Sequence, residues 1–349
     1  MWISSWDHTL DLASAFGSEC TKRGCPSLMT VRYEDIWLRS ISELSKEQLK
    51  GVPPQMKAAL AKTNFFILTM GPRRPIPWDS IPKTRRRLVS VWLDTRYDKS
   101  PYAREWAETS RLHGVRMLAI EATLATPERA KALGLDYDEW KDVMFRGCLA
   151  DHKEIAKRSR ALARVLSGKE KVRVSTPSGT ELCLVLDRRS VEISDGIATK
   201  AKAERGLVTF LPAGAIEVSV NEESAEGSVV YDAPVSMGSQ TIQGLEINLK
   251  DGRIHRYVAA RGVDAFGRYL QGGGRDAGRF AFLGFGLNPN LRHGYTQDDK
   301  VLGDVTLGFG DNTTMGGKNR ASEQWWASVV KPTVTVNGAE IMDEGRLLV

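Results

Sequence analysis

Short apolar segments alternate with helical segments through the first half of this chain. The runs NFFILTM (64–70), RLVSVWLD (87–94) and VRMLAIE (115–121) are continuous and apolar, as is typical of buried strands. Helical patterns lie over residues 44–63 and 100–114. A chain in which strands alternate with helices favours an α/β fold with a mostly parallel sheet.

The pattern changes near Gly168. Beyond it, short strands of period two are separated by Ser-Gly, Asp-Gly and Asn-Gly turns, and many of the chain's 32 glycines lie here. We therefore predict two domains: an N-terminal α/β domain over 1–168 and a strand-rich domain over 169–349. The fold class is α/β, or α+β when both domains are taken together.

Charge and composition limit the classes of partner that this chain is expected to bind. The net charge of +6 is small for 349 residues, and the sequence contains no nucleic-acid-binding motif, so no nucleic acid partner is expected. No apolar run reaches the length of about 18 residues that a membrane helix needs, and the N-terminus does not read as a signal peptide. Four cysteines without a CxxC pair favour free thiols in the cytoplasm.

Several segments of the later half carry a resemblance when taken in order. They are LPAGAIEVSVNEESAEG, FAFLGFGLNP, DDKVLGDVTLGFGDN and MGGKNRASEQWWASVV. Together they resemble the M29-type metallo-aminopeptidases and their relatives, the 2,5-dihydroxypyridine dioxygenases. The resemblance implies an aminopeptidase-like C-terminal domain and a homodimer.

The same resemblance implies a set of metal ligands that this chain lacks. The family's carboxylates and histidines fall, without gaps, on Ala215, Phe282, Thr306, Trp325 and Ala327. Hard or borderline metals need charged or imidazole donors, and none of these side chains supplies one. We therefore expect no metal and no other cofactor.

One carboxylate leaves the question of metal open. Glu217 lies two residues after Ala215, so both side chains point to the same face of a strand. Glu217 is thus a candidate ligand of a shifted metal site.

Aromatic and polar residues around the lost ligands suggest a binding role instead. Large aromatic side chains either line a binding groove or fill the vacated space, and the sequence does not decide between these. The candidate ligand-binding residues are Phe282, Thr306, Trp325, Trp326, Glu217, Asp299 and Asp311, with Glu323 as a further polar neighbour.

The leading hypothesis is a metal-free protein of M29 type. It would bind a peptide or peptide-like ligand, in the setting of the modification of a ribosomal peptide in natural-product biosynthesis. Two alternatives stay open: a metal-dependent aminopeptidase that releases N-terminal residues, and a non-haem iron ring-cleaving dioxygenase with a shifted site. The sequence does not decide whether any reaction is catalysed.

Overall fold

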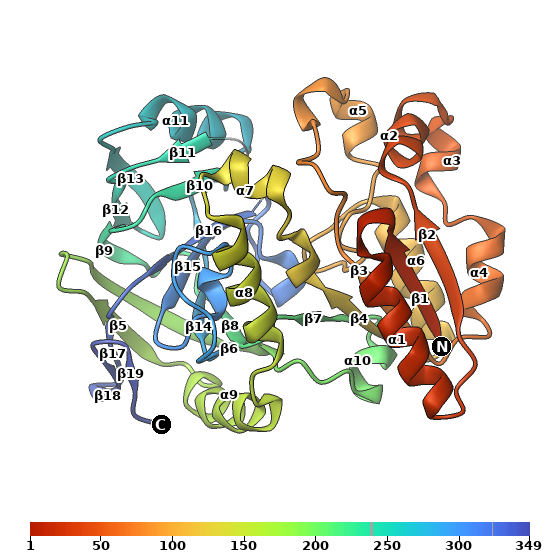
Figure 1. Ribbon diagram of the computed structural model, residues 1–349. Helices are drawn as coiled ribbons and strands as arrows, with labels where there is room; N and C mark the ends of the chain where they lie inside the picture. Colours follow the sequence, from red (N-terminus) through yellow and green to blue (C-terminus); the bar gives the residue numbers. More distant parts are fainter. Residues whose placement is uncertain (238–239, 323) are drawn as a thin grey trace. The chain divides into compact units, whose positions relative to one another are not determined.

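A computed structural model describes residues 1–237, 240–322 and 324–349. The chain divides into two compact units (Figure 1). The first unit consists of Met1–Cys148 with Gly196–Pro212, and the second of Leu149–Asp195 with Ala213–Val349. The sequence predicts a boundary at residue 168, one helix after the boundary in the structure. The helix over residues 152–166 belongs to the second unit, because it packs on strands of that unit.

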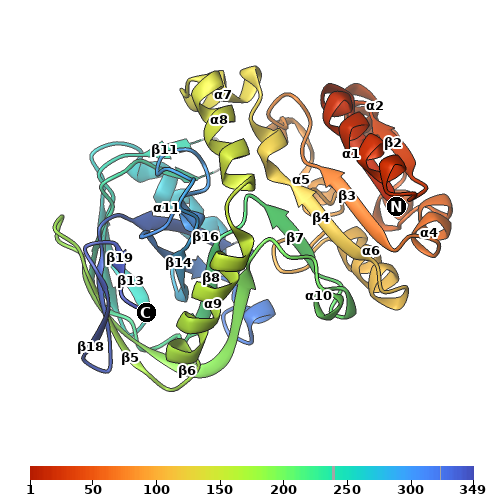
Figure 2. The same ribbon diagram turned by 60° about the horizontal axis from the view of Figure 1, so that its bottom comes forward.

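The first unit is built on a five-stranded sheet in which every pairing is parallel, with the order β2-β1-β3-β4-β7. Its strands are β1 (Trp2–Trp6), β2 (Leu28–Arg32), β3 (Phe65–Thr69), β4 (Arg116–Ile120) and β7 (Val208–Leu211). Helix α1 lies on one face of this sheet, and α6 and α10 lie on the other (Figure 2). The parallel sheet predicted from the alternating pattern is confirmed.

Local signals set where the helices of this unit begin. Ser45 and Gln48 form a reciprocal capping box at α3, Ser100 caps α6, and Thr126 caps α7. The helices are α1 (Leu10–Lys22), α2 (Glu34–Glu43), α3 (Lys46–Lys50), α4 (Pro54–Leu60), α5 (Lys83–Arg86), α6 (Pro101–Leu112), α7 (Pro127–Leu133), α8 (Tyr137–Cys148) and α10 (Lys200–Glu204). Short 3₁₀ turns are η1 (Asp7–Thr9), η2 (Trp78–Ser80) and η3 (Glu121–Leu124).

One predicted strand of this unit is wrong. Residues 87–94 form turns and bends, and Leu93 has a φ of 56°. The sheet position beside β4 is taken instead by β7, from a distant part of the chain. The buried carboxylate of Asp94 accepts a hydrogen bond from the backbone N–H of Val208 at 2.9 Å, so this segment anchors β7 rather than joining the sheet.

The second unit is built on a 12-stranded sheet. The main path runs β16-β15-β14-β8-β6-β5-β17-β18-β19, and β9, β12 and β13 branch from β6. The strands are β5 (Lys171–Ser175), β6 (Glu181–Ser194), β8 (Ala215–Val220), β9 (Glu226–Val230), β12 (Glu246–Lys250), β13 (Arg253–Val258), β14 (Phe280–Gly286), β15 (Val305–Gly310), β16 (Gln324–Val329), β17 (Thr333–Val336), β18 (Ala339–Asp343) and β19 (Arg346–Leu347). A separate hairpin joins β10 (Val235–Met237) and β11 (Gln240–Ile242).

The long strand β6 links the two halves of this sheet. Its first half pairs with β5 and β9, and its second half pairs with β8. Helix α9 (His152–Leu166) packs on β6 and β8, while α11 (Val263–Gly272) packs near β11. The short turns η4 (Asp298–Lys300) and η5 (Thr313–Met315) flank β15. The predicted combination of a parallel α/β part and a strand-rich part is therefore confirmed.

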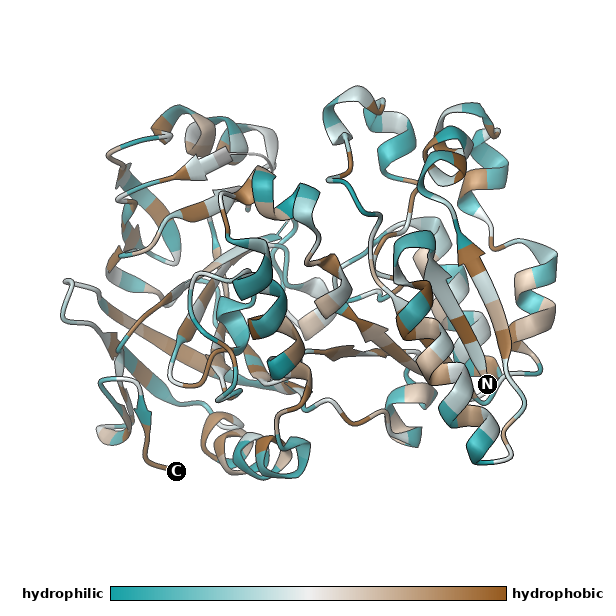
Figure 3. Cartoon of the chain, viewed as in Figure 1, coloured by the Kyte–Doolittle hydropathy of each residue, from teal (hydrophilic) through white to brown (hydrophobic). Residues whose placement is uncertain are grey.

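Each unit has its own hydrophobic core. In both units the strands carry most of the strongly hydrophobic positions, and the helices show alternating character (Figure 3). Leu162 and Leu166 of α9 join the core that the second unit's strands form, and Trp106 of α6 joins the core of the first. No helix in the described part of the chain is both long and apolar enough to cross a membrane.

Candidate functional site

Four neighbouring antiparallel strands of the second unit align a row of polar positions. Glu217 of β8 pairs with Gly284 of β14, Gly284 pairs with Thr306 of β15, and Thr306 pairs with Ser328 of β16. Directly paired residues of neighbouring strands point to the same face of a sheet. The register therefore brings Glu217 and Thr306, which the sequence singled out, onto one face.

A second row lies two residues along each strand and so points the same way. It consists of Ser219, Phe282, Gly308 and Trp326. We call the side of β8, β14, β15 and β16 that carries both rows the site face. Glu217, Phe282, Thr306 and Trp326 share it.

Trp325 lies on the opposite face. It pairs with Phe309, and the two rings stack with centroids 4.6 Å apart. Phe266 of α11 meets the same indole edge-on, and Trp325 is only 5% exposed. Trp325 is thus a core residue. The sequence grouped it with Thr306 as a candidate ligand-binding residue, but the two side chains lie on opposite faces, because a shift of one residue along a strand reverses the face.

A β-bulge at Ala281 directs Phe282 to the site face. The register shifts between Phe280 and Phe282, so Phe280 faces the core against Phe309 while Phe282 pairs with Gly308 on the other side. The carbonyl of Ala281 accepts hydrogen bonds from the Ser219 hydroxyl at 3.2 Å and from the amide of Asn312 at 3.1 Å. Both donors satisfy a carbonyl that the irregular ladder leaves unpaired.

The aromatic residues of the site face have different roles. Phe282 is 2% exposed, and its ring covers Gly308 and packs with Met315. Trp326 is 42% exposed, with its ring centroid 6.5 Å from that of Phe282. Phe282 therefore fills space, whereas Trp326 presents an aromatic surface to solvent.

Gly284 contributes no side chain at the centre of the site face, where Thr306 and Glu217 lie close on either side. A Cβ atom there would lie 3.2 Å from the Cβ of Thr306 and 3.5 Å from the Cγ of Glu217. The buried hydroxyls of Thr306 and Ser328 hydrogen-bond to each other at 2.9 Å. The row thus holds a carboxylate and a hydroxyl pair, separated by a residue without a side chain.

A second carboxylate extends the row on β6. Glu192 pairs with Glu217 across the β6–β8 ladder, and Glu192 is buried. Like charges at directly opposed positions destabilise a sheet. Two acidic side chains therefore lie side by side on this face of the sheet.

The site face is closed at one end by backbone. Ala215 and Gly286 pair on this face, as the predicted shared face of Ala215 and Glu217 requires. The carbonyl of Val301 lies so close to Gly286 that a Cβ atom there would approach it to 1.9 Å. No side chain larger than hydrogen fits at that position.

A buried ion pair lies at the other end of the site face. The guanidinium of Arg189 donates to both carboxylate oxygens of Glu222, at 2.6 and 2.7 Å, and to Ser219 at 3.0 Å. The amide of Asn312 and the backbone N–H of Lys318 also donate to Glu222, at 3.1 and 2.6 Å. Burial alone would raise the pKa of Glu222, but these hydrogen bonds outweigh it and hold the pKa at about 2.

The other candidate residues lie away from the central row. Asp311 accepts hydrogen bonds from the N–H and hydroxyl of Thr313, at 2.9 and 2.7 Å, and so closes the turn after β15. Asp299 lies in η4, where burial raises its pKa and the charge of Lys300 opposes that rise. Glu323 lies outside the described residues.

One imidazole–carboxylate pair could not be predicted from the sequence. Nδ1 of His293 lies 2.6 Å from Asp304, and Nε2 lies 3.7 Å from Asp298. Burial would lower the pKa of His293, but the hydrogen bond to Asp304 and the nearby carboxylates raise it, while burial raises the pKa of Asp298 and Asp304. A separation of 11 residues across a loop has no periodic signal, so only the fold reveals this cluster.

The donor set of the site face does not match a two-metal centre. Thr306 and Ser328 offer neutral hydroxyls already bonded to each other, and Phe282 and Trp326 offer no donor. Across residues 1–237, 240–322 and 324–349, no group of three His, Cys, Asp or Glu side chains is arranged to hold a metal ion. Zinc and similar ions are held by several charged or imidazole ligands at once.

Fold and site together define an α/β protein with an aminopeptidase-like frame and a remodelled central row. Residues 1–283 match the family model of thermophilic metalloproteases (M29). The chain therefore belongs to the M29 family.

Solved structures share the same fold at low sequence identity. AmpT from Thermus thermophilus is 15% identical, with a TM-score of 0.69 over 100% of this chain and 94% of that one. The 2,5-dihydroxypyridine dioxygenase from Pseudomonas putida KT2440 is 13% identical, with a TM-score of 0.61 over 99% and 91%. No curated protein matches this chain in sequence.

Proposed function

We propose that this chain is an M29 family member that binds a peptide or peptide-like ligand on its site face without a metal ion. The observation that carries the proposal is the row Glu217, Gly284, Thr306 and Ser328, with Trp326 exposed beside it. The family's sheet is kept, but the row now offers acid, hydroxyl and aromatic groups.

These groups suit the N-terminal end of a peptide. In this proposal the ammonium group of the ligand lies beside the carboxyl groups of Glu192 and Glu217, and charge-assisted hydrogen bonds are strong. The indole of Trp326 provides apolar area for a side chain, at a small entropic cost. Gly284 places no side chain between Glu217 and Thr306.

The biological setting is part of the proposal. A protein that holds the N-terminal part of a ribosomal peptide would assist its modification in natural-product biosynthesis. A homodimer is proposed as well, and light scattering on the purified chain measures it directly.

Titration calorimetry with a panel of X-Gly-Gly tripeptides tests the binding proposal. The panel carries Leu, Phe or Lys at the first position, each with a free or an acetylated N-terminus. We expect the free peptides to bind and acetylation to weaken them about tenfold, because it removes the cation. Glu217→Gln should remove the same preference, whereas Glu340→Gln, an exposed carboxylate on β18, should keep it. Equal binding of free and acetylated peptides would overturn this mode of recognition.

The acidic pair also favours a second candidate, a metal-dependent enzyme with a shifted site. Glu192 and Glu217 are two carboxylates on one face, and carboxylates ligate Mg²⁺, Ca²⁺ and Zn²⁺. Metal analysis of the purified chain separates the candidates. Stoichiometric zinc, cobalt or iron that Glu217→Gln abolishes would favour the enzyme over the binding protein.

A further inference from the structure

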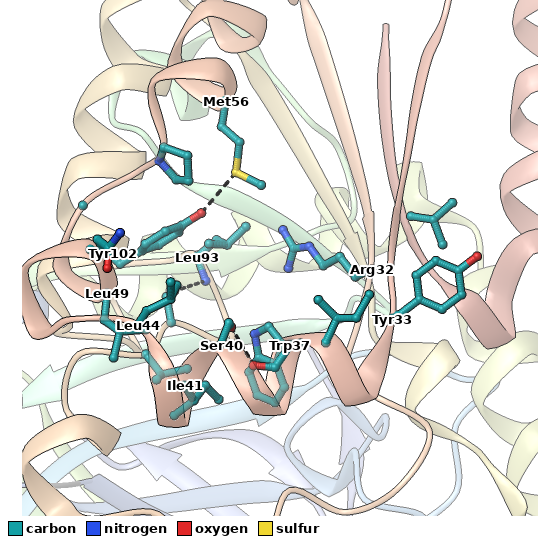
Figure 4. Close-up of a pocket in the computed structure, with 17 residues that line it drawn as sticks. Arg32, Tyr33, Trp37, Ser40, Ile41, Leu44, Leu49, Met56, Leu93 and Tyr102 are labelled. Atoms are coloured by element: carbon teal, nitrogen blue, oxygen red, sulfur yellow. Dashed lines mark hydrogen bonds between the residues drawn. The ribbon is translucent and has the colours of Figure 1, made fainter.

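A separate pocket lies in the first unit. Its volume is about 320 Å³, within the range of about 300–1,000 Å³ for small-molecule sites. Helix α2 forms one wall with Trp37 and Ile41, while Met56 of α4 and Tyr102 of α6 lie across from it (Figure 4). None of these residues belongs to the site face.

The lining is mostly apolar and contains one charged side chain. Arg32 is the one charged side chain among the described residues that line the pocket. Figure 4 shows its guanidinium extending into the pocket toward Leu93. A fixed positive charge in an apolar cavity is a complement to an anion.

Arg32 lacks a counter-ion of its own. In the described residues no carboxylate pairs with it; Glu34 and Asp35 at the start of α2 bind Arg74. Burial lowers the pKa of Arg32, yet a guanidinium stays protonated at neutral pH. Arg32 is half-buried, and a charge in an apolar lining is stabilised when an anion pairs with it.

Three hydroxyl groups of the lining already have hydrogen-bond partners. The hydroxyl of Tyr102 donates to Sδ of Met56 at 3.4 Å, and Ser40 donates to the carbonyl of Trp37 at 2.7 Å. Ser90 accepts from the N–H of Leu93 at 3.2 Å. Arg32 is therefore the charged group of the lining that can pair with an anion.

The position in the sheet supports a ligand site independently. Arg32 is the last residue of β2, at the carboxyl edge of an all-parallel sheet, and α2 begins two residues later. Open parallel sheets bind their ligands outside the carboxyl ends of their strands. The pocket lies at that edge.

We propose that this pocket binds a small organic anion, a single carboxylate on an apolar, ring-bearing body. The carboxylate accepts hydrogen bonds from the guanidinium of Arg32, and the body packs against Trp37, Ile41 and Met56. The rim exposes Tyr33 and Ile36, which extends the apolar surface to the entrance.

Titration calorimetry on the full chain tests this site with phenylpropionate and its neutral analogue phenylpropanol. We expect wild type to bind the acid at least about tenfold more tightly than the alcohol. Arg32→Met should abolish that preference, and Arg32→Lys should keep part of it. Arg39→Met, an exposed arginine of α2 outside the pocket, should leave it intact.

The wild-type comparison needs no variant, so it stands even if Arg32→Met fails to fold, which thermal unfolding would reveal. Equal affinity for acid and alcohol, no binding of the acid, or an acid preference that persists in folded Arg32→Met would each overturn the proposal.

Discussion

The ring of Phe282 lies against the backbone of Gly308, so closely that a Cβ atom at 308 would come within 1.9 Å of the ring. The two residues pair across β14 and β15 on the site face. Gly308→Ala should therefore destabilise the chain by about 1–3 kcal/mol through overpacking, as urea unfolding would measure.

The same contact makes a coupling prediction. Phe282→Ala removes the obstructing ring, so the double variant should be more stable than the sum of the two single changes predicts. Gly272→Ala is the matched control, because a Cβ atom there meets nothing within 4 Å. Strict additivity of the two changes would show that Phe282 does not pack on Gly308.

The Arg189–Glu222 pair predicts a response to acid. The pKa of Glu222 is lowered from 4.5 to about 2, so its stabilising contribution is present above about pH 4.5 and is lost as the pH falls through about 2. Glu222→Gln should cost about 3–5 kcal/mol at neutral pH, because it leaves Arg189 buried without a counter-charge.

Urea unfolding of both proteins across this pH range checks the sign. The stability difference between wild type and Glu222→Gln should shrink as the pH falls from 4.5 to 2. A difference that stays constant would mean that Glu222 titrates alike in the folded and unfolded chains.

The His293–Asp304 pair predicts a dependence of stability on pH that is opposite in sign to that of Glu222. Because the pKa of His293 is raised above 6.5, the stability from its protonated form is present below pH 6.5 and is lost as the pH rises through the folded pKa. The NMR titration of the His293 ring should have its midpoint above 6.5. Asp304→Asn should lower that midpoint, because burial lowers the pKa of His293 and the carboxylate that opposes this effect is removed. An unchanged midpoint would contradict the pairing of His293 with Asp304.

The adjacent tryptophans should behave differently when replaced. Trp325→Ala should cost about 3–5 kcal/mol of stability, because the ring stacks on Phe309 in the core. Trp326→Ala should change stability far less and should weaken peptide binding. The opposite pattern in urea unfolding and calorimetry would reverse the assignment of faces.

Period-two reasoning predicted part of this arrangement. It placed Ala215 and Glu217 on one face, because β8 is a regular strand. Trp325 became a candidate through the family resemblance, which does not fix the face it occupies. That face depends on the pairing of β16 with Thr306 and Gly308, and no local pattern encodes that pairing. The bulge at Ala281 was missed for the same reason.

Contacts between residues far apart in the chain could not be predicted from the sequence either. The alternation of the first half predicted a parallel sheet, but the apolar run over 87–94 forms no strand, because β7 fills the place beside β4. Arg189 reaches Glu222 only because the β6–β8 register is interrupted between Leu186 and Val191. Such contacts depend on how the sheet closes rather than on spacing along the chain.

The most direct test of the central claim is tripeptide binding before and after removal of metal. Calorimetry with Leu-Gly-Gly should give the same affinity in chain dialysed against EDTA and in chain supplied with zinc, cobalt or iron. Glu217→Gln should weaken that affinity about tenfold in either state. Binding or cleavage of the tripeptide that occurs only after metal is restored would contradict a metal-free binding face.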